Sequence, residues 1–184
     1  QLCAILMFCK DTKFKKIMKI ILCILFIFTV LTSSLKADNT VNLITLYKEL
    51  HANPELSFKE EKTSTKLASI LKNLGLEVTE NFGGYGVVAL FRNGEGKTIM
   101  LRADMDGLPV KELTGATYAS RTKSVNQVGD EVFTMHACGH DIHMTSLIGT
   151  VINLLKKRDE WQGTLLINLQ PAEEVSGGAR NMIK

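Results

Sequence analysis

The chain has 184 residues, of which 45% are hydrophobic and 22% are charged. This mixture is typical of one globular domain and excludes an intrinsically disordered chain. Much of the formal net charge of +3 comes from lysines near the N-terminus, namely Lys10, Lys13, Lys15, Lys16 and Lys19. Because the rest of the chain is close to neutral, it lacks the basic surface that nucleic-acid binding requires.

The N-terminal segment has the pattern of a secretory signal. The basic run ends at Lys19, an apolar core of 12 residues follows (IILCILFIFTVL), and small residues lead to Ala37 as the last residue before cleavage. Residues 1–37 then comprise upstream residues and a signal peptide that starts at Met18, and residues 38–184 form the mature chain. Because a membrane-spanning helix needs about 20 apolar residues, an uncleaved anchor is the alternative. The sequence predicts a secreted or periplasmic protein.

The cysteines agree with this division of the chain. Three of the four lie in or before the signal, and the mature chain keeps only Cys138. One thiol cannot form an internal disulfide, so Cys138 is free, bound to a metal or paired with another chain.

The first half of the mature chain predicts two helices and then strands. Apolar residues recur at helical spacing over 41–50, and Pro54 ends that helix. Ser57 and Glu60 have the spacing of a capping box that opens a helix over 58–74, which Gly75 closes. Three strands follow, and the turn NGEGK between the second and third predicts a hairpin. These strands are LEVTE (76–80), GVVALFR (86–92) and TIMLRAD (98–104).

The second half predicts an irregular excursion, a helix, a strand and a short helix. Residues 111–134 are polar and have no clear period, and such long excursions often carry function. A helix begins at His143, with one apolar stripe. A buried strand at 163–170 (GTLLINLQ) precedes a helix within 176–184. The members of the stripe are Met144, Leu147, Ile148, Val151 and Leu155. This order predicts an α/β fold in which helices cover both faces of the sheet.

Acidic residues follow two of the predicted strands. Asp104 and Asp106 lie at the end of one strand, and Glu173 and Glu174 follow another. Ligands of α/β sheets gather at the carboxyl ends of strands, so we expect these carboxylates to converge on one edge. The segment HACGHD (136–141) leads into the next helix and joins them there.

Cys138 and His140 are spaced to bind a metal ion from one loop. Thiolate, imidazole and carboxylate are ligands for zinc or a neighbouring transition metal, although a buried cysteine beside surface histidines is the simpler alternative. Of the two glutamates, one suits metal binding and the other suits proton transfer from a metal-activated water. An aspartate at 104 or 106 suits a hydrogen bond to a ligand histidine, and a surface turn is its alternative.

Four segments together resemble the M20 metallopeptidase family. They are HANPELSFKEEKT, LRADMDGLPV, MHACGHDIHM and LQPAEEVSGGARNMI, in this order along residues 43–184. Within the family, the resemblance is to the branch that contains aminoacylases, hippurate hydrolases and plant auxin-conjugate hydrolases.

The resemblance implies a zinc-peptidase-like catalytic domain with a helix-covered mixed β-sheet, interrupted by a lid domain that often dimerises. It matches Cys138, His140 and Glu174 to metal ligands, Glu173 to the general base and Asp106 to an aspartate that steadies the site. It does not favour His136, Asp141 or His143 as ligands. It also implies two divalent ions, most simply zinc or manganese. The family's further histidine ligands and its lid have no match before Lys184, so residues 38–184 read as an incomplete catalytic domain that is inactive alone.

The sequence thus predicts a metal-dependent hydrolase that cleaves the amide bond of N-acyl amino acids or small peptides. It predicts contact with the membrane only through the signal segment, and a homodimer formed through the lid. Two other classes stay open. One is a non-catalytic metal-binding or solute-binding protein on the same scaffold. The other is a hydrolase with Cys138 as nucleophile and His140 or His143 as base.

Overall fold

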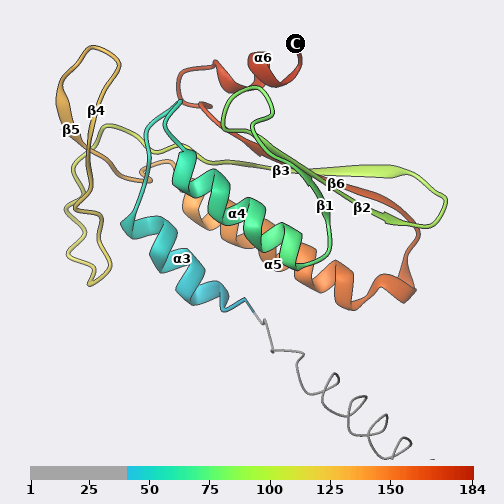
Figure 1. The fold of residues 1–184 in the computed structure, drawn as a ribbon. Coiled ribbons are helices and arrows are strands. Elements are labelled where there is room, and N and C mark those ends of the chain that lie inside the picture. Colours follow the sequence, from blue (N-terminus) through green and yellow to red (C-terminus); the bar gives the residue numbers. More distant parts are fainter. Residues whose placement is uncertain (1–40) are drawn as a thin grey trace, which may run out of the picture. The chain divides into compact units, whose positions relative to one another are not determined.

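In the computed structural model, which describes residues 41–184, a four-stranded mixed sheet packs against three helices (Figure 1). The predicted signal peptide lies outside the described residues. The strands run in the spatial order β1-β2-β6-β3, with β6 antiparallel to β2 and parallel to β3. Their bounds are β1 Glu77–Thr79, β2 Val87–Asn93, β3 Thr98–Asp104 and β6 Gly163–Gln170. The predicted α/β class with a mixed sheet is confirmed.

The predicted hairpin between β2 and β3 is wrong, because β6 lies between these two strands. The connecting loop instead crosses the start of β6, where Thr164 donates a backbone hydrogen bond to the carbonyl of Lys97. Gly163 has φ +124°, and a Cβ built there would lie 2.3 Å from the same carbonyl oxygen. A glycine at 163 therefore permits the crossing.

The helices largely follow their predicted bounds. They are α3 Leu43–Ala52, α4 Glu61–Asn73, α5 His140–Lys156 and α6 Gly178–Met182, with a 3₁₀ turn η1 at Arg158–Glu160. The apolar stripe of α5 is confirmed, since Met144, Ile148 and Val151 are fully buried. However, α5 begins at His140 and not at His143, so His140 is held in the first helical turn rather than in a loop.

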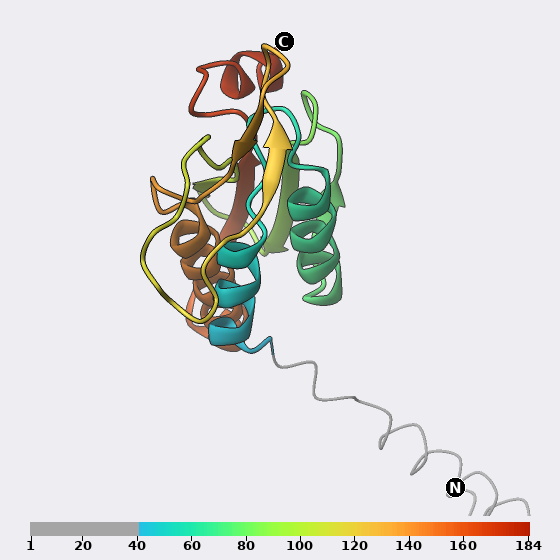
Figure 2. The same cartoon turned by 90° about the vertical axis from the view of Figure 1, so that its left-hand side faces the viewer.

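All three long helices pack on one face of the sheet, and in Figure 1 they run beneath the strands. Figure 2 shows α3 between α4 and α5. The sheet residues of this core include Val87, Ala89, Ile167 and Leu169. The alternate residues point away from the helices, and we call this side the open face. Its apolar members are Val88, Leu90, Met100 and Leu166. Within residues 41–184, the prediction of helices on both faces is therefore wrong.

The predicted capping box at the start of α4 is also wrong. Ser57 Oγ donates to Asp106 Oδ2 at 2.6 Å, and the side chain of Glu60 accepts a bond from the backbone of Ala172. The N-cap position of α4 has no side-chain hydrogen bond. Both side chains are used for tertiary contacts, which a local spacing rule cannot anticipate. The predicted C-terminal glycine is confirmed, because Gly75 has φ +88° and donates to Lys72 O.

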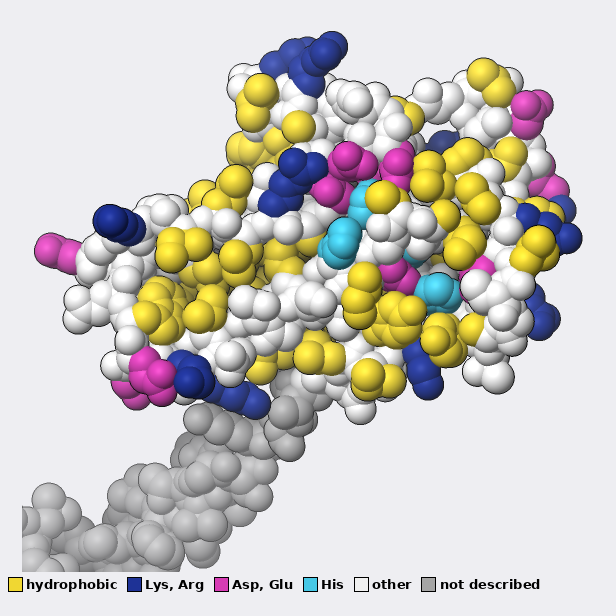
Figure 3. All heavy atoms as spheres, turned by 180° about the vertical axis from the view of Figure 1, so that it is seen from behind, with side chains coloured by type: hydrophobic (Ala, Val, Ile, Leu, Met, Phe, Trp, Pro, Cys, Tyr) yellow, Lys and Arg dark blue, Asp and Glu magenta, His cyan; other side chains and the backbone are white. Residues whose placement is uncertain are grey.

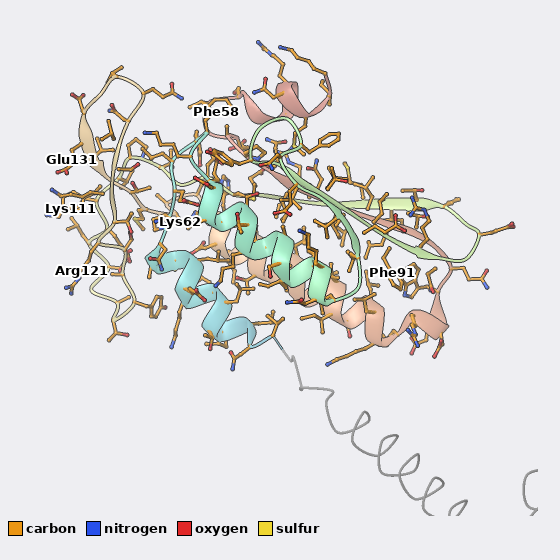
Figure 4. The ribbon with its side chains drawn as sticks, in the orientation of Figure 1. Phe58, Lys62, Phe91, Lys111, Arg121 and Glu131 are labelled. Carbon is orange, nitrogen blue, oxygen red and sulfur yellow. The ribbon has the colours of Figure 1, made fainter. Side chains whose placement is uncertain are left out.

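The excursion at 111–134 contains a short hairpin that the sequence did not predict. Strands β4 (Lys123–Val125) and β5 (Glu131–Phe133) pair antiparallel and stand apart from the main sheet in Figure 1. Figure 4 shows Lys111, Arg121 and Glu131 along this segment. The two strands are too short for periodicity to show them. In the described part of the chain, no helix is both long and apolar enough to cross a membrane.

Candidate metal centre

The candidate site forms where the parallel strands β3 and β6 end side by side. Their last residues, Asp104 and Gln170, are register partners, and each strand leads into an acidic loop. Helix α5 begins beside these loops. Seen from behind (Figure 3), acidic and histidine side chains gather in the central part of the surface, with hydrophobic side chains around them.

Three candidate ligands lie close together. Atoms of Cys138, His140 and Glu174 are all within 4.8 Å of one another. Gly139 lies between the first two and has φ +80°, a left-handed conformation that glycine adopts without strain. This turn lets a residue before α5 and the first residue of α5 approach the same point. Cys138 is exposed, whereas His140 is buried.

The carboxylate of Asp106 joins the parts of this centre. It accepts hydrogen bonds from the backbone N–H of Glu173 at 3.1 Å and of Glu174 at 3.0 Å, besides the bond from Ser57. Its other close neighbour is His140 Nδ1, which lies 2.8 Å from the Asp106 carbonyl and 3.4 Å from Oδ1. Asp106 therefore fixes the backbone of the two glutamates. It also orients His140 so that the other ring nitrogen, Nε2, faces the glutamate carboxylates.

Electrostatics around Asp106 follow from these contacts. Burial opposes its charge, but the hydrogen bonds from His140, Ser57 and the two glutamate amides lower its pKa. Burial likewise opposes the imidazolium of His140, and Asp106 outweighs this and raises the pKa of His140 to about 9. Unlike Asp106, Asp104 forms an ion pair, in which its Oδ1 lies 2.8 Å from the guanidinium of Arg102.

The two glutamates differ in their surroundings. The Glu174 side chain is 17% exposed, and its buried Oε1 has no hydrogen-bond partner within the described residues. The Glu173 side chain is 39% exposed and lies with Oε2 3.9 Å from His140 Nε2. An unpartnered buried carboxylate oxygen beside a thiol and an imidazole is the donor set that a divalent transition metal needs. The residues present therefore fit a metal ion.

The loop that carries the glutamates is held in an unusual conformation. Ala172 has φ +48°, which costs energy for a residue with a Cβ, and its N–H donates to Glu60 Oε1 at 2.7 Å. A Cβ at Gly178 would lie 1.6 Å from the Pro171 carbonyl oxygen, so only glycine fits there. Phe58 lies beside this loop (Figure 4) and contacts Gly177. The sequence pattern alone did not indicate these supports.

A second buried cluster lies around His51, which the sequence interpretation missed. His51 Nδ1 lies 2.7 Å from Asp141 Oδ2, and Nε2 lies 3.0 Å from Glu112 Oε1. The rings of Tyr47 and Tyr118 pack against the imidazole. Burial opposes the charge on His51, and the two carboxylates outweigh it and raise its pKa. The one available signal was the location of His51 and Asp141 within two of the quoted segments.

The remaining motif histidines do not join the three candidate ligands. His136 is buried and neither ring nitrogen has a partner in the described residues; burial, together with nearby His140, lowers its pKa to about 4. His143 is exposed and stacks obliquely on His140, with ring centroids 5.9 Å apart. Neither lies in the close group of Cys138, His140 and Glu174.

Comparisons with known proteins show which proteins this chain is similar to. Residues 100–184 match the family model for peptidase family M20/M25/M40. The chain is 43% identical over 146 residues to thermostable carboxypeptidase 2 of Saccharolobus solfataricus, covering 77% of this chain and 35% of that protein. It is 43% identical over 137 residues to hippurate hydrolase of Campylobacter jejuni, covering 74% of this chain and 33% of that protein.

A solved structure extends the likeness to three dimensions. The YXEP protein of Bacillus subtilis, described as a dinuclear metal binding peptidase of the M20 family, superposes with a TM-score of 0.67 at 38% identity. The match covers 77% of this chain and 37% of that one. The α/β scaffold and its converging thiol, imidazole and carboxylates are therefore similar to part of a dinuclear metal binding peptidase. Over residues 100–184 the chain is similar to peptidase family M20/M25/M40, and it spans about a third of the length of the curated relatives it matches.

Proposed function

We propose that the protein is a metal-dependent hydrolase of amide bonds in N-acyl amino acids or small peptides. The observation that carries this proposal is the convergence of Cys138, His140 and Glu174 with a second carboxylate, Glu173, outside their close group. Relatives support the substrate class, since they include a carboxypeptidase and a hippurate hydrolase.

Cys138, His140 and Glu174 would hold the metal, and the family neighbour described as dinuclear supports a pair of divalent ions. When bound, the ions lower the pKa of a coordinated water and polarise the carbonyl group of the scissile amide. Zinc fits the mixed sulfur, nitrogen and oxygen donors, and manganese is the alternative.

Glu173 would act as the general base and then as the general acid. Its carboxylate is partly exposed toward the site, and its backbone is fixed by Asp106. The carboxylate takes a proton from the attacking water as the new C–O bond forms. It then gives that proton to the amide nitrogen as the C–N bond breaks, so the products are a carboxylic acid and an amine.

Asp106 would serve as a positioning residue. Its four contacts set the ring orientation of His140 and the backbone of both glutamates. Such a carboxylate behind a ligand histidine fixes the orientation of the ring and makes the nitrogen that faces the metal a more basic ligand.

Metal removal tests this function against its competitors. We expect a chelator to abolish hydrolysis of N-benzoylglycine by the full-length protein, and zinc or manganese to restore it. A thiol-alkylating reagent should inactivate the metal-free protein and spare the metal-loaded one. Inactivation by the reagent regardless of metal would favour Cys138 as nucleophile. Metal binding without hydrolysis of any N-acyl amino acid or peptide would favour a binding protein.

Export is a separate part of the proposal. The basic run that ends at Lys19 and the apolar core at residues 20–31 support cleavage after Ala37 and a secreted or periplasmic location. N-terminal sequencing of the protein made in a bacterium tests this, because retention of residues 19–37 would indicate an anchor or a cytosolic protein. Dimerisation through a lid domain is likewise proposed and is checked by the mass of the full-length protein in solution.

A further inference from the structure

A pocket adjoins the candidate metal centre and shares Glu174 with it. Its volume is about 350 Å³, which is at the small end of pockets that bind small molecules. One wall is the segment that contains Leu56, and the opposite wall is the tip of the β4–β5 hairpin, including Val128. In Figure 2 this hairpin points toward the same end of the molecule as α6.

The lining of this pocket is mainly apolar. Its apolar side chains are Leu56, Leu108, Pro109, Val128 and Val175. Val128 is 81% exposed and Val175 is 45% exposed, so both offer apolar surface that has no covering group within the described residues. An apolar ligand group would gain free energy by covering them.

Hydrogen bonds hold the β4–β5 hairpin that forms this wall of the pocket. Asn126 Oδ1 accepts backbone hydrogen bonds from Val128 at 3.1 Å and from Asp130 at 2.9 Å, which orders the tip. Lys59 Nζ donates to the carbonyl of Val125 and ties the hairpin to the opposite wall. At its base, Thr122 Oγ1 donates to the Ala52 carbonyl at 3.2 Å. The tip that carries Val128 is therefore ordered, and the hairpin is bonded to the segments before α4.

Charge decides which half of a substrate this pocket suits. The amino-acid half carries a carboxylate close to its side chain and requires a cation. Among the lining residues Lys59 is the only cation, and its ammonium is already bonded to Val125. The acyl half is uncharged and is joined directly to the carbonyl that reacts beside Glu174.

We infer that this pocket binds the acyl group of the substrate and that the β4–β5 hairpin selects for apolar, aromatic-sized acyl groups. The inference rests on the proposed function, because it assigns the acyl side of that same site. Val128 acts here through direct contact with the acyl group.

The test compares Val128→Asp with Leu113→Asp in the full-length, metal-loaded protein. Leu113 is 83% exposed on the same excursion and does not line the pocket, so it is a matched control. For Val128→Asp, kcat/KM for N-benzoylglycine relative to N-acetylglycine should fall about tenfold or more. Leu113→Asp should leave this ratio unchanged. An unchanged ratio in Val128→Asp, or a selective loss for N-acetylphenylalanine instead, would overturn the inference.

A binding measurement separates this inference from the proposed function. Benzoate added to protein with labelled methyl groups should shift the resonances of Val128 and Leu108, whereas acetate should not. If no N-acyl amino acid is hydrolysed but benzoate gives these shifts, the proposed activity fails and the apolar pocket stands. If hydrolysis occurs and benzoate leaves both resonances unmoved, the pocket assignment fails and the activity stands.

Discussion

At the scale of single residues, the candidate centre separates binding from proton transfer. Two neighbouring glutamates have the same backbone anchor, Asp106, yet one has a buried oxygen without a partner and the other faces solvent. This difference in environment is the basis for giving Glu174 to the metal and Glu173 to the proton.

The change Glu173→Gln should remove proton transfer and keep the metal. The amide has nearly the same shape but cannot accept a proton, so we expect kcat to fall by about 10²–10⁴-fold. Metal content measured by atomic emission should stay close to that of the unchanged protein, while Glu174→Gln should lose metal. A Glu173→Gln protein with near-native kcat would show that another group is the base.

Glu60 gives a pH dependence of stability. Burial raises its pKa from 4.5 to about 7. Between these values the folded protein binds more protons than the unfolded chain, so the free energy of unfolding falls as the pH rises. The fall is roughly 3 kcal/mol, complete just above pH 7. Glu60→Gln keeps an acceptor for Ala172 and should reduce this slope.

Urea unfolding followed by the fluorescence of Trp161 at pH 5 and pH 8 measures the effect. The exposed neighbour Glu61 provides the control, since Glu61→Gln should keep the slope of the unchanged protein. Equal slopes for Glu60→Gln and the unchanged protein would mean that the Glu60 carboxyl is not protonated on folding.

At the scale of elements, buried polar contacts join segments that are far apart in the sequence. His51 of α3 binds Asp141 in the first turn of α5 and Glu112 of the excursion. One imidazole therefore connects three segments next to the residue that begins α5, His140. This contact fixes the direction from which α5 presents His140.

Removal of this imidazole should be costly. In His51→Ala the carboxylates of Asp141 and Glu112 lose their shared partner, and we expect a loss of about 3–5 kcal/mol in the free energy of unfolding. Because the pKa of His51 is raised, this contribution is complete below about pH 6.5, the ordinary value, and is lost as the pH rises through the folded-state pKa.

Chemical unfolding at pH 6 checks this loss, and His143→Ala is the control because His143 is exposed. The control should lie within about 0.5 kcal/mol of the unchanged protein. Hydrogen exchange should also show reduced protection in the first turns of α5 for His51→Ala alone. A His51→Ala protein as stable as the control would show that the cluster contributes little to the free energy of unfolding.

These long-range contacts explain which parts of the fold could not be predicted from the sequence. The apolar stripe of α5 and the buried strand β6 were predictable because burial imposes a period on nearby residues. The hairpin of β2 and β3 was mispredicted because their shared partner is β6, and each residue of β3 pairs with a residue of β6 that comes 66 positions later, as Thr98 does with Thr164. The capping box failed for a similar reason, since Ser57 and Glu60 bond to Asp106 and Ala172.

The candidate ligands were predictable because their residue types are rare and closely spaced, and the segments around them resemble a known family. Their mutual distances were not, since they depend on the parallel pairing of β3 with β6 and on the turn at Gly139. The roles of His51 and Glu112 depend on contacts across 61 and 90 residues, which no local pattern encodes.

At the scale of the whole molecule, the open face of the sheet is an apolar surface against which no helix layer packs within residues 41–184. Met100 is 58% exposed there, and Val88, Leu90 and Leu166 are half-buried. Apolar residues on a sheet face usually pack against another layer. The chain spans about a third of its curated relatives, so the described residues need not form a complete unit.

We expect residues 41–184, when expressed alone, to self-associate through the open face. Met100→Lys should reduce this association because it places a charge in the apolar surface. Sedimentation velocity measures the change, and Ile44→Lys is the control, since Ile44 is 66% exposed on α3 and away from the sheet. Equal effects of both substitutions would indicate general solubility and no role for the open face.

The same segment should also bind fewer than two equivalents of metal and lack amidase activity, since it offers three candidate ligands in one close group. Titration with zinc followed by calorimetry measures the stoichiometry. Hydrolysis of N-benzoylglycine at about 1 s⁻¹ or faster would contradict this expectation.

The central place of β6 has a consequence for synthesis on the ribosome. When β3 leaves the exit tunnel, it has no strand to pair with, and β2 has only the short β1. Both wait until residues 163–170 emerge and insert between them. The glutamates follow at once in the chain, so the sheet closes and the carboxylates reach Cys138 and His140 in one late event. Until then, a nascent chain exposes two strand edges that are open to pairing with other chains.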